Sequence, residues 1–489
     1  MSNSKSGVKL KDIDLLRTES YLFDGWRAAR LGTTIPVLNP ANGQVITQVA
    51  SLGADETEAA IAGAVKAQVQ WRKLTAQARA RLLQAWYAQI MQHAEDIAQL
   101  MTAEQGKPLA ESRGEVNYAA SFVEWFAEEG KRTYGDTIPA PAADKRLFVI
   151  KQPIGVCAAI TPWNFPAAMI TRKVAPALAA GCAIIVKPAE ETPLTALALA
   201  ALAERAGIPA GVFQVIVGDA RQIGGVLTAS PDVRKLSFTG STEVGRLLMA
   251  QSAPTVKRLS LELGGNAPFI VFDDADVDAA VEGAMVSKYR NSGQTCVCAN
   301  RLLVQAGIYD VFVEKLRAKV AALKIGDGTE DGVQQGPLIN QDALDHALAL
   351  IEDATQLGAS VVVGGKAHAL GGTFFEPTIL RDLTLDMRVA HEEIFAPVAP
   401  VFRFETEEQA VAQANDTEYG LAAYLYTGDL ARAWRVGEAL EYGMVGLNTG
   451  LISNEVAPFG GIKQSGLGRE GSHYGIDEYL ETKYLCLQV

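Results

Sequence analysis

The chain has 489 residues, and its 44 basic and 56 acidic residues give a formal net charge of -12. This length predicts two or more domains, and the acidic balance disfavours a nucleic-acid binder, which needs basic side chains along the phosphates. The five cysteines are too few and too scattered for a disulfide framework, and no Cys/His cluster has zinc spacing, so we expect no structural metal.

No segment is predicted to cross a membrane. The most apolar stretch, 174–186, is too short to span a bilayer and is interpreted as a buried helix that runs into a strand. The polar start, Met1 to Asp12, lacks the apolar core of a signal peptide. We therefore expect a cytoplasmic protein, with no membrane and no nucleic acid among its partners.

The first third of the chain is predicted to be largely helical. Residues 55–58 resemble a capping box with Asp55 as the cap, and apolar residues then recur at helical spacing up to 69. A second helical stretch ends near Gly106-Lys-Pro108, and a third runs from about 111 to 129. After it, 137–144 is rich in Pro and Ala and 146–151 alternates like a strand, which predicts a protruding ribbon.

From residue 154 onward, short apolar strands alternate with helices, which indicates a parallel sheet in a doubly wound α/β domain. Ligands of such sheets bind beyond the carboxyl ends of the strands. A similar pattern from Pro268 onward predicts a second α/β domain. The expected strands are 154–160, 183–186, 213–217, 235–238, 360–363, 400–404 and 484–489, and the expected helices of the second domain are 279–289 and 309–322.

Two motifs follow predicted strands of the first domain. The run Phe238-Thr-Gly-Ser-Thr-Glu-Val-Gly245 opens a helix whose free N–H groups favour a phosphate, although a turn that uses Gly for packing is the alternative. In Ile184-Ile-Val-Lys-Pro-Ala-Glu190, Lys187 and Glu190 lie just past a strand end. An acidic residue there can accept both hydroxyls of an adenosine ribose, and a solvated surface pair is the alternative.

A third motif, Leu261-Glu-Leu-Gly-Gly-Asn266, sets the carboxylate of Glu262 in an apolar strand. Burial would raise its pKa toward neutrality and make it a usable general base. The alternative is a Glu on the exposed face of an alternating strand.

The fourth motif, Asn291-Ser-Gly-Gln-Thr-Cys296-Val-Cys298, places a thiol in a polar setting. Gly293 indicates a tight loop before Cys296, where a nearby base could activate the thiol as a nucleophile. Cys157 and Cys182 lie in apolar runs instead and are interpreted as inert buried cysteines.

These four motifs, in this order, resemble the NAD(P)-dependent aldehyde dehydrogenase family over nearly the whole chain. Thr161-Pro-Trp-Asn-Phe-Pro166, Glu392-Glu-Ile-Phe395 and Pro458-Phe-Gly-Gly461 also match. The resemblance implies an α/β fold with a Rossmann-type cofactor domain (1–130 and 154–264), an α/β catalytic domain (265–470) and a small β oligomerisation ribbon (131–153 and 471–489). It also implies a homodimer or homotetramer.

The resemblance further implies roles for individual residues. Cys296 matches the nucleophile, Glu262 the base that activates water, Asn164 the side-chain donor to the oxyanion, and Glu470 a carboxylate that relays protons. Glu190 favours NAD, with NADP as the alternative, because some bacterial members carry Ser there and prefer NADP. Cofactor contacts are expected from Thr161, Pro162, Trp163, Asn164, Lys187, Glu190, Gly240, Ser241, Gly245, Leu263, Glu393 and Phe395.

Within the family the chain most resembles succinate-semialdehyde dehydrogenases, through 163–173, 296–298 and 451–454. The implied reaction converts succinate semialdehyde, a small anionic aldehyde of GABA degradation, to succinate through a thiohemiacetal and a thioester. Glutarate semialdehyde or another omega-carboxy aldehyde is the alternative, because one methylene discriminates by only about 1–3 kcal/mol. Arg172, Arg290 and Ser453 are expected around the distal carboxylate. Arginines that merely cap helices or pair with surface acids are the alternative.

Two competing functions make separable predictions. A structural protein that kept only the fold would be expected to lose the nucleophile or the base, whereas Cys296, Glu262 and Asn164 are all present. Relatives that transfer the acyl group to CoA usually lack the Glu262 equivalent. Cys298 has two interpretations of its own, loop packing or reversible oxidation with Cys296, because a disulfide between such near neighbours is strained and reducible.

Overall fold

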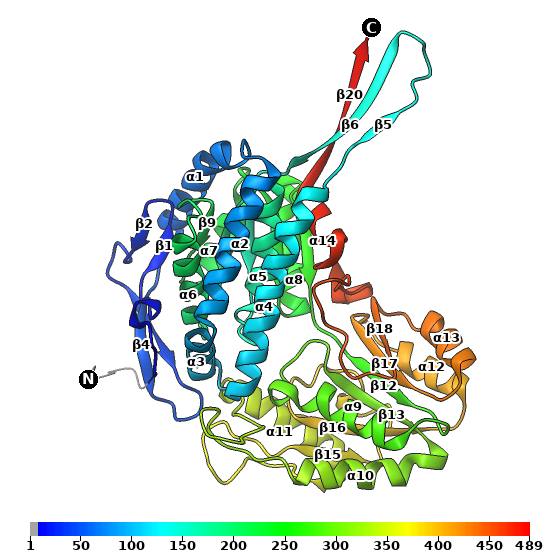
Figure 1. Cartoon of the computed structure of the whole chain (residues 1–489). Coiled ribbons are helices and arrows are strands. Elements are labelled where there is room, and N and C mark those ends of the chain that lie inside the picture. Colours follow the sequence, from blue (N-terminus) through cyan, green and yellow to red (C-terminus); the bar gives the residue numbers. More distant parts are fainter. Residues whose placement is uncertain (1–7) are drawn as a thin grey trace.

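The structure is a computed structural model that describes residues 8–489, so the prediction for Met1 to Asp12 lies partly outside the described residues. Two large sheets, each covered by helices, and a projecting antiparallel ribbon make up the molecule (Figure 1). Within the described residues no helix is long and apolar enough to cross a membrane.

The first sheet has eight strands, and its central strands are parallel, as the alternation of strands and helices predicts. Its outer members β19 and β1 run antiparallel to their neighbours. In spatial order the strands are β19 (Gly466–Leu467), β11 (Arg258–Glu262), β10 (Val233–Thr239), β7 (Val156–Ile160), β8 (Ala183–Lys187), β9 (Phe213–Val215), β1 (Ser20–Leu22) and β2 (Gly25–Arg27).

Helices cover both faces of this sheet because successive strand residues point to opposite sides. Cys157 and Ala159 of β7 pack toward one layer, and Ala158 packs toward the other. The first layer contains α2 (Ala76–Gln92), α3 (Ala94–Gln105), α4 (Leu109–Glu129), α5 (Ala168–Ala180) and α6 (Pro193–Arg205). The second contains α1 (Ala54–Trp71), α7 (Ala220–Ala229) and α8 (Thr242–Ser252).

Two details of the predicted helices were wrong. The cap of α1 is Gly53 rather than Asp55, because Glu56 accepts the Gly53 N–H at 3.1 Å. The second helical stretch is two helices, α2 and α3, which meet at His93. The predicted stop near Gly106 is confirmed, since α3 ends there at a φ of 92°, where glycine is favoured.

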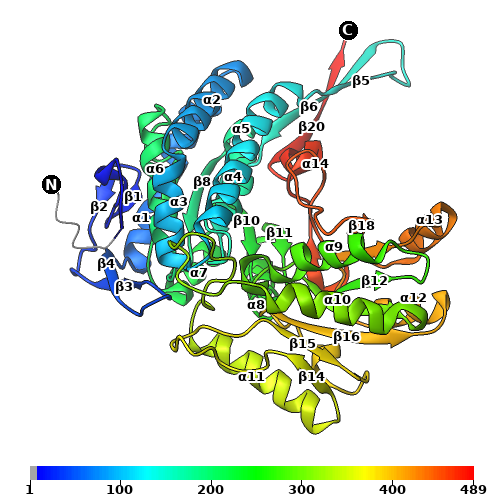
Figure 2. The same cartoon turned by 60° about the horizontal axis from the view of Figure 1, so that its bottom comes forward.

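The second sheet has seven strands, all parallel to their neighbours except β14. In spatial order they are β14 (Ser360–Val363), β15 (Thr378–Arg381), β16 (Val398–Phe404), β13 (Ala299–Gln305), β12 (Ala267–Val271), β17 (Ala422–Tyr426) and β18 (Met444–Leu447). Helices α9 (Val277–Tyr289) and α10 (Tyr309–Ala321) lie side by side on one face (Figure 2). The other face holds α11 (Gln341–Gln356), α12 (Glu407–Asn415) and α13 (Leu430–Ala439).

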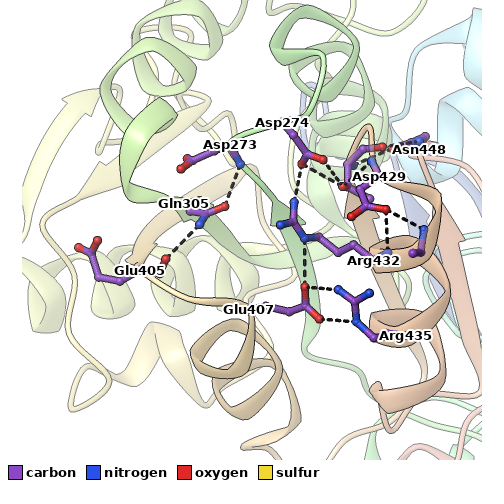
Figure 3. A network of polar contacts seen from close by, with 11 residues as sticks. Asp273, Asp274, Gln305, Glu405, Glu407, Asp429, Arg432, Arg435 and Asn448 are labelled. Atoms are coloured by element: carbon purple, nitrogen blue, oxygen red, sulfur yellow. Dashed lines mark hydrogen bonds and ion pairs between the residues drawn. The ribbon is translucent and has the colours of Figure 1, made fainter.

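The two sheets present opposite ends to the space between them. Residues after β7, β10 and β11 meet residues that precede β12, β13 and β16 in a shared cavity. At the opposite end of the second sheet, a polar network lies at the carboxyl ends of the strands (Figure 3). There, Arg432 of α13 donates to Asp274 and Glu407. The carboxyl-end rule therefore describes the first sheet, whereas the second contributes its amino ends.

A three-stranded antiparallel ribbon projects from the molecule and carries the C-terminus near its tip (Figure 1). It consists of β5 (Asp136–Ile138), β6 (Lys145–Pro153) and β20 (Leu480–Gln488), with α14 (Ser472–Asp477) leading into β20. Apolar side chains such as Phe148, Leu485 and Leu487 are exposed on it. A separate hairpin, β3 (Thr34–Leu38) with β4 (Val45–Ala50), lies near the N-terminal end.

Candidate active site

Two cavities meet at Cys296, which lines both of them. The strand-end cavity, of about 230 Å³, is lined by Pro162, Trp163, Asn164, Thr239, Gly240, Ser241, Glu262, Leu263, Gly264, Cys296, Glu393 and Phe395. The arginine cavity, of about 300 Å³, is lined by Glu111, Gly114, Glu115, Tyr118, Phe165, Met169, Arg172, Arg290, Thr295, Cys296, Val297, Leu451, Ser453 and Phe459. The candidate nucleophile therefore lies where a cofactor and a substrate approaching from two sides would meet.

The loop before Cys296 is tight, as Gly293 predicted. Asn291, Ser292 and Gly293 all have positive φ, with values of 51°, 54° and 74°. A Cβ on Gly293 would lie 2.3 Å from the carbonyl oxygen of Ala396, so only glycine fits there. Burial raises the pKa of Cys296 to about 12, against the opposing effect of neighbouring Arg172, so the resting thiol holds its proton at neutral pH.

Asn164 follows β7 and reaches the loop that carries the thiol. Its Nδ2 donates to the carbonyl oxygen of Gln294 at 3.1 Å, and its Oδ1 is buried without a partner in the described chain. Its own carbonyl oxygen accepts from Lys107 Nζ at 2.6 Å and from Asn291 Nδ2 at 3.0 Å. Both the side chain and the backbone of Asn164 are thereby held against the Cys296 loop.

Glu262 is the last residue of β11 and is only 2% exposed, so the interpretation as an exposed strand residue is wrong. Neither carboxylate oxygen has a hydrogen-bond partner among the described residues. Burial, and then the nearby charge of Glu470, raise the pKa of Glu262 well above its usual value. A buried carboxyl group with a raised pKa, lining one cavity with a thiol, suits proton transfer.

Glu470 lies between two cations of α5. One carboxylate oxygen accepts from Arg172 Nε and the other from Lys173 Nζ, and all three side chains are buried. Although burial opposes ionisation, Arg172 and Lys173 hold the pKa of Glu470 below its usual value. Glu470 is therefore an ionised carboxylate close to the more easily protonated Glu262.

The two predicted substrate arginines differ in their contacts. Arg172 is paired with Glu470, and its Nη2 is buried without a partner in the described chain. Arg290 forms no ion pair with any residue of 8–489, and its guanidinium lies 5.4 Å from the centre of the Phe165 ring. Both line the arginine cavity with Ser453, and neither pairs with a surface acid among residues 8–489, although Arg290 stands at the C-cap of α9.

Four predicted cofactor residues lie outside the lining of the strand-end cavity. Lys187 Nζ contacts Glu190 Oε1 at 3.2 Å, and the same oxygen accepts the Ala220 N–H at the start of α7. Thr161 is buried with an unpartnered hydroxyl. A Cβ on Gly245 would lie 2.4 Å from Leu263 Cδ2, which supports the packing interpretation of that glycine. Ser241 caps α8, as expected of a helix that opens toward a ligand.

Sequence reasoning missed the contribution of α4. Glu111, Glu115 and Tyr118 line the arginine cavity, and Lys107 lies directly before the helix. Gly106-Lys-Pro108 was interpreted only as the end of a helix. Glu111 and Glu115, four residues apart, lie on one face of α4, and this spacing was the available signal.

A family model described as the aldehyde dehydrogenase family matches residues 26–485. The chain belongs to the aldehyde dehydrogenase family. It is 63% identical over 98% of its length to an NADP(+) succinate-semialdehyde dehydrogenase of Escherichia coli, covering 100% of that protein. It is 64% identical over 98% of its length to a glutarate-semialdehyde dehydrogenase of Pseudomonas aeruginosa, covering 99% of it.

A crystal structure of succinate-semialdehyde dehydrogenase from Burkholderia pseudomallei matches this aldehyde dehydrogenase with a TM-score of 0.98. The two chains are 63% identical, and the match covers 98% of this chain and 100% of the other. The predicted family and its mixed α/β fold are therefore confirmed, and the chain is an aldehyde-oxidising enzyme of a family that uses NAD(P).

Proposed function

We propose that this aldehyde dehydrogenase oxidises succinate semialdehyde to succinate, with glutarate semialdehyde as the alternative substrate. The observation that carries the proposal is that Cys296 lines one cavity with Arg290, a cation that has no ion pair among residues 8–489. A guanidinium can hold a carboxylate by two hydrogen bonds, and Ser453 and the free Nη2 of Arg172 supply further donors. The names of the two relatives support both candidate substrates.

In the proposed mechanism Glu262 accepts the thiol proton, and the Cys296 sulfur adds to the aldehyde carbon. The oxygen that becomes negative is stabilised by Asn164 Nδ2 and the Cys296 N–H, and one such donor is worth about 2.7–4 kcal/mol. Once this proton has left Glu262, its carboxylate accepts a proton from the water molecule that hydrolyses the thioester left by hydride loss. Glu470, close to Glu262, passes the released proton outward.

The strand-end cavity suits a nicotinamide dinucleotide, which takes up the hydride when it is bound. The Thr239 hydroxyl, which is buried with no partner among the described residues, and the capped start of α8 offer polar groups for it. Glu393 and Phe395 would hold the nicotinamide side, and Lys187 and Glu190 the adenosine ribose. Glu190 favours NAD, because a carboxylate repels a 2′-phosphate, although one relative is named for NADP(+).

We further propose that the first sheet with its helices is the cofactor domain (1–130 and 154–264), and that the second is the catalytic domain (265–470). The ribbon (131–153 and 471–489) would join subunits into a homodimer or homotetramer. The exposed apolar side chains of β6 and β20 support this role. Light scattering on a variant shortened within β20 tests whether the ribbon joins subunits, because loss of the ribbon should yield monomers.

The decisive experiment is a panel of aldehyde pairs, assayed with NAD and with NADP. The two members of each pair have equal chain length, and one of them has a distal carboxylate. We expect the highest kcat/KM for succinate semialdehyde, next for glutarate semialdehyde, and no stimulation by CoA. Equal kcat/KM for succinate semialdehyde and butanal would overturn the substrate proposal. A clear preference for NADP would overturn the interpretation of Glu190.

A further inference from the structure

Lys107 is a buried lysine with fixed contacts next to the active site. It is 2% exposed, and its Nζ donates to Glu115 Oε2 at 2.5 Å and to the carbonyl oxygen of Asn164 at 2.6 Å. The same ammonium lies 4.0 Å from the centre of the Phe165 ring. Because a buried charge is tolerated only in good geometry, this ion pair fixes the position of the Asn164 backbone.

Glu115 fixes the other end of the same segment. Its Oε1 accepts the N–H of Ala167 at 2.9 Å and that of Ala168 at 3.3 Å, at the start of α5. The segment 164–168 is therefore held at its first residue by Lys107 and at its last residues by Glu115. A negative charge at the start of a helix also stabilises the helix.

The same helix face reaches the loop of the thiol. Glu111, one turn before Glu115 on α4, accepts the N–H of Asn291 at 2.8 Å. Asn291 in turn donates from Nδ2 to the carbonyl oxygen that Lys107 binds. Through these buried contacts, the start of α4 holds both the segment that carries Asn164 and the loop that leads to Cys296.

We propose that Lys107 and Glu115 are positioning residues that hold the Asn164 amide in place beside Cys296 before an aldehyde binds. The inference rests on the proposed role of Asn164 as donor to the oxyanion. A displacement of about 1 Å at a reacting centre costs about 100-fold in rate, so a rigid backbone support has a catalytic effect without touching the substrate.

The test uses Lys107→Met and Glu115→Gln in the full-length enzyme, with propanal as a substrate that has no distal carboxylate. We expect kcat to fall about 10- to 100-fold while the KM for propanal and the affinity for NAD stay within about 3-fold. The hydrolysis of p-nitrophenyl acetate, which needs no cofactor, should fall in parallel. An unchanged kcat in both variants would overturn the proposal.

Glu104→Gln is the matched control. Glu104 is 1% exposed and accepts the N–H groups of Leu194 and Thr195 at 2.7 and 2.8 Å, at the start of α6. It thus supports a helix start as Glu115 does, but it lines neither of the two cavities that meet at Cys296. We expect wild-type kcat in this variant. An equal fall in kcat for Glu104→Gln and Glu115→Gln would mean that both act only through stability.

A double-mutant cycle with Asn164→Ala tests the route of the effect. If Lys107 acts through Asn164, Lys107→Met lowers kcat in the wild type but not further in Asn164→Ala. If the fold losses in kcat of the two single variants multiply in the double variant, the proposal is wrong. A wild-type kcat for Asn164→Ala alone would instead show that the proposed oxyanion role is wrong. Glu115→Gln, which keeps the side-chain volume, replaces Lys107→Met in the cycle if that variant does not fold.

Discussion

Arg172 and Glu470 form a buried ion pair at the wall of the cavity that contains Cys296. Lys173 binds the second oxygen of the same carboxylate, so Arg172 is committed through its Nε while its Nη2 has no partner in the described chain. Arg290 lines the same cavity and has no ion pair in the described chain. The two arginines predicted to hold the substrate carboxylate are therefore unequal, and their replacement should have different consequences.

Replacing Arg290 should remove substrate affinity with little structural damage. We expect Arg290→Ala to raise the KM for succinate semialdehyde about 10- to 100-fold, because a hydrogen bond to a charged group contributes about 1.5–3 kcal/mol. The KM for butanal should hardly change. The KM of Arg290→Lys for succinate semialdehyde should lie between those of the wild type and Arg290→Ala. Steady-state kinetics with both aldehydes measures this. Equal increases for both substrates would contradict the role of Arg290.

Replacing Arg172 should instead destabilise the fold. Among the described residues, Arg172→Met leaves buried Glu470 paired with Lys173 alone, and breaking a buried pair costs about 3–5 kcal/mol. We expect a clear fall in the Tm of Arg172→Met, measured by scanning calorimetry, and a Tm near that of the wild type for Arg290→Ala. A wild-type Tm for Arg172→Met would mean that the ion pair has no net stabilising effect.

Glu262 links catalysis to stability through its protonation. Burial and Glu470 raise its pKa well above the usual value of a glutamate, so the folded chain keeps this proton at pH values where the unfolded chain has lost it. The contribution of this proton to the free energy of unfolding is fully present below about pH 4.5. It is lost as pH rises toward the pKa of Glu262 in the folded chain. Glu262→Gln, which stays neutral, should keep its Tm over this range.

The kcat of the enzyme should change with pH in the opposite direction to its stability. The carboxylate fraction of Glu262 grows with pH, so kcat of the wild type should rise as pH rises, whereas Glu262→Gln should be nearly inactive with a flat profile. Thermal unfolding and kcat measured over the same pH series test both effects. A Tm of Glu262→Gln that falls with pH exactly in parallel with the wild type would exclude Glu262 as the cause.

The sequence predicted the secondary structure well where side-chain pattern dominates. The central strands of the first sheet are where the apolar runs indicated, because parallel strands covered on both faces must be apolar throughout. The start of α1 was misjudged because its cap is a glycine, whose N–H is bound by Glu56. No side chain at Gly53 could reveal that contact.

Most of the candidate site was also predicted, since Cys296, Glu262 and Asn164 line one cavity. Each of these residues lies in a short sequence motif of the family. Lys107 carries no such motif, and its contact with Asn164 spans 57 positions of the chain. Its role depends on how α4 packs against α5, which the local pattern of either helix does not contain.

Cys298 is the residue whose two interpretations the contacts now separate. It is 6% exposed, and its Sγ donates to the carbonyl oxygen of Lys288 at 3.3 Å, so at rest it packs against α9. It lines neither of the two cavities that contain Cys296. Reaction between the two thiols therefore requires the loop to turn Cys298 away from Lys288.

We predict that such a reaction protects the enzyme from peroxide. Once Glu262 has taken the Cys296 proton, peroxide would oxidise the thiolate to a sulfenic acid, and the Cys298 thiol would then attack that sulfur, releasing water and forming a disulfide. Dithiothreitol should restore activity to the wild type after peroxide treatment. Cys298→Ala should recover much less, because its sulfenic acid proceeds to irreversible oxidation.

The exposed Cys486 on the ribbon provides the matched control, because Cys486→Ala removes a thiol far from the loop and should recover like the wild type. Mass spectrometry of the treated protein should find a peptide containing both Cys296 and Cys298 that has lost two hydrogens. Equal recovery of the wild type and Cys298→Ala would leave Cys298 with its packing role alone.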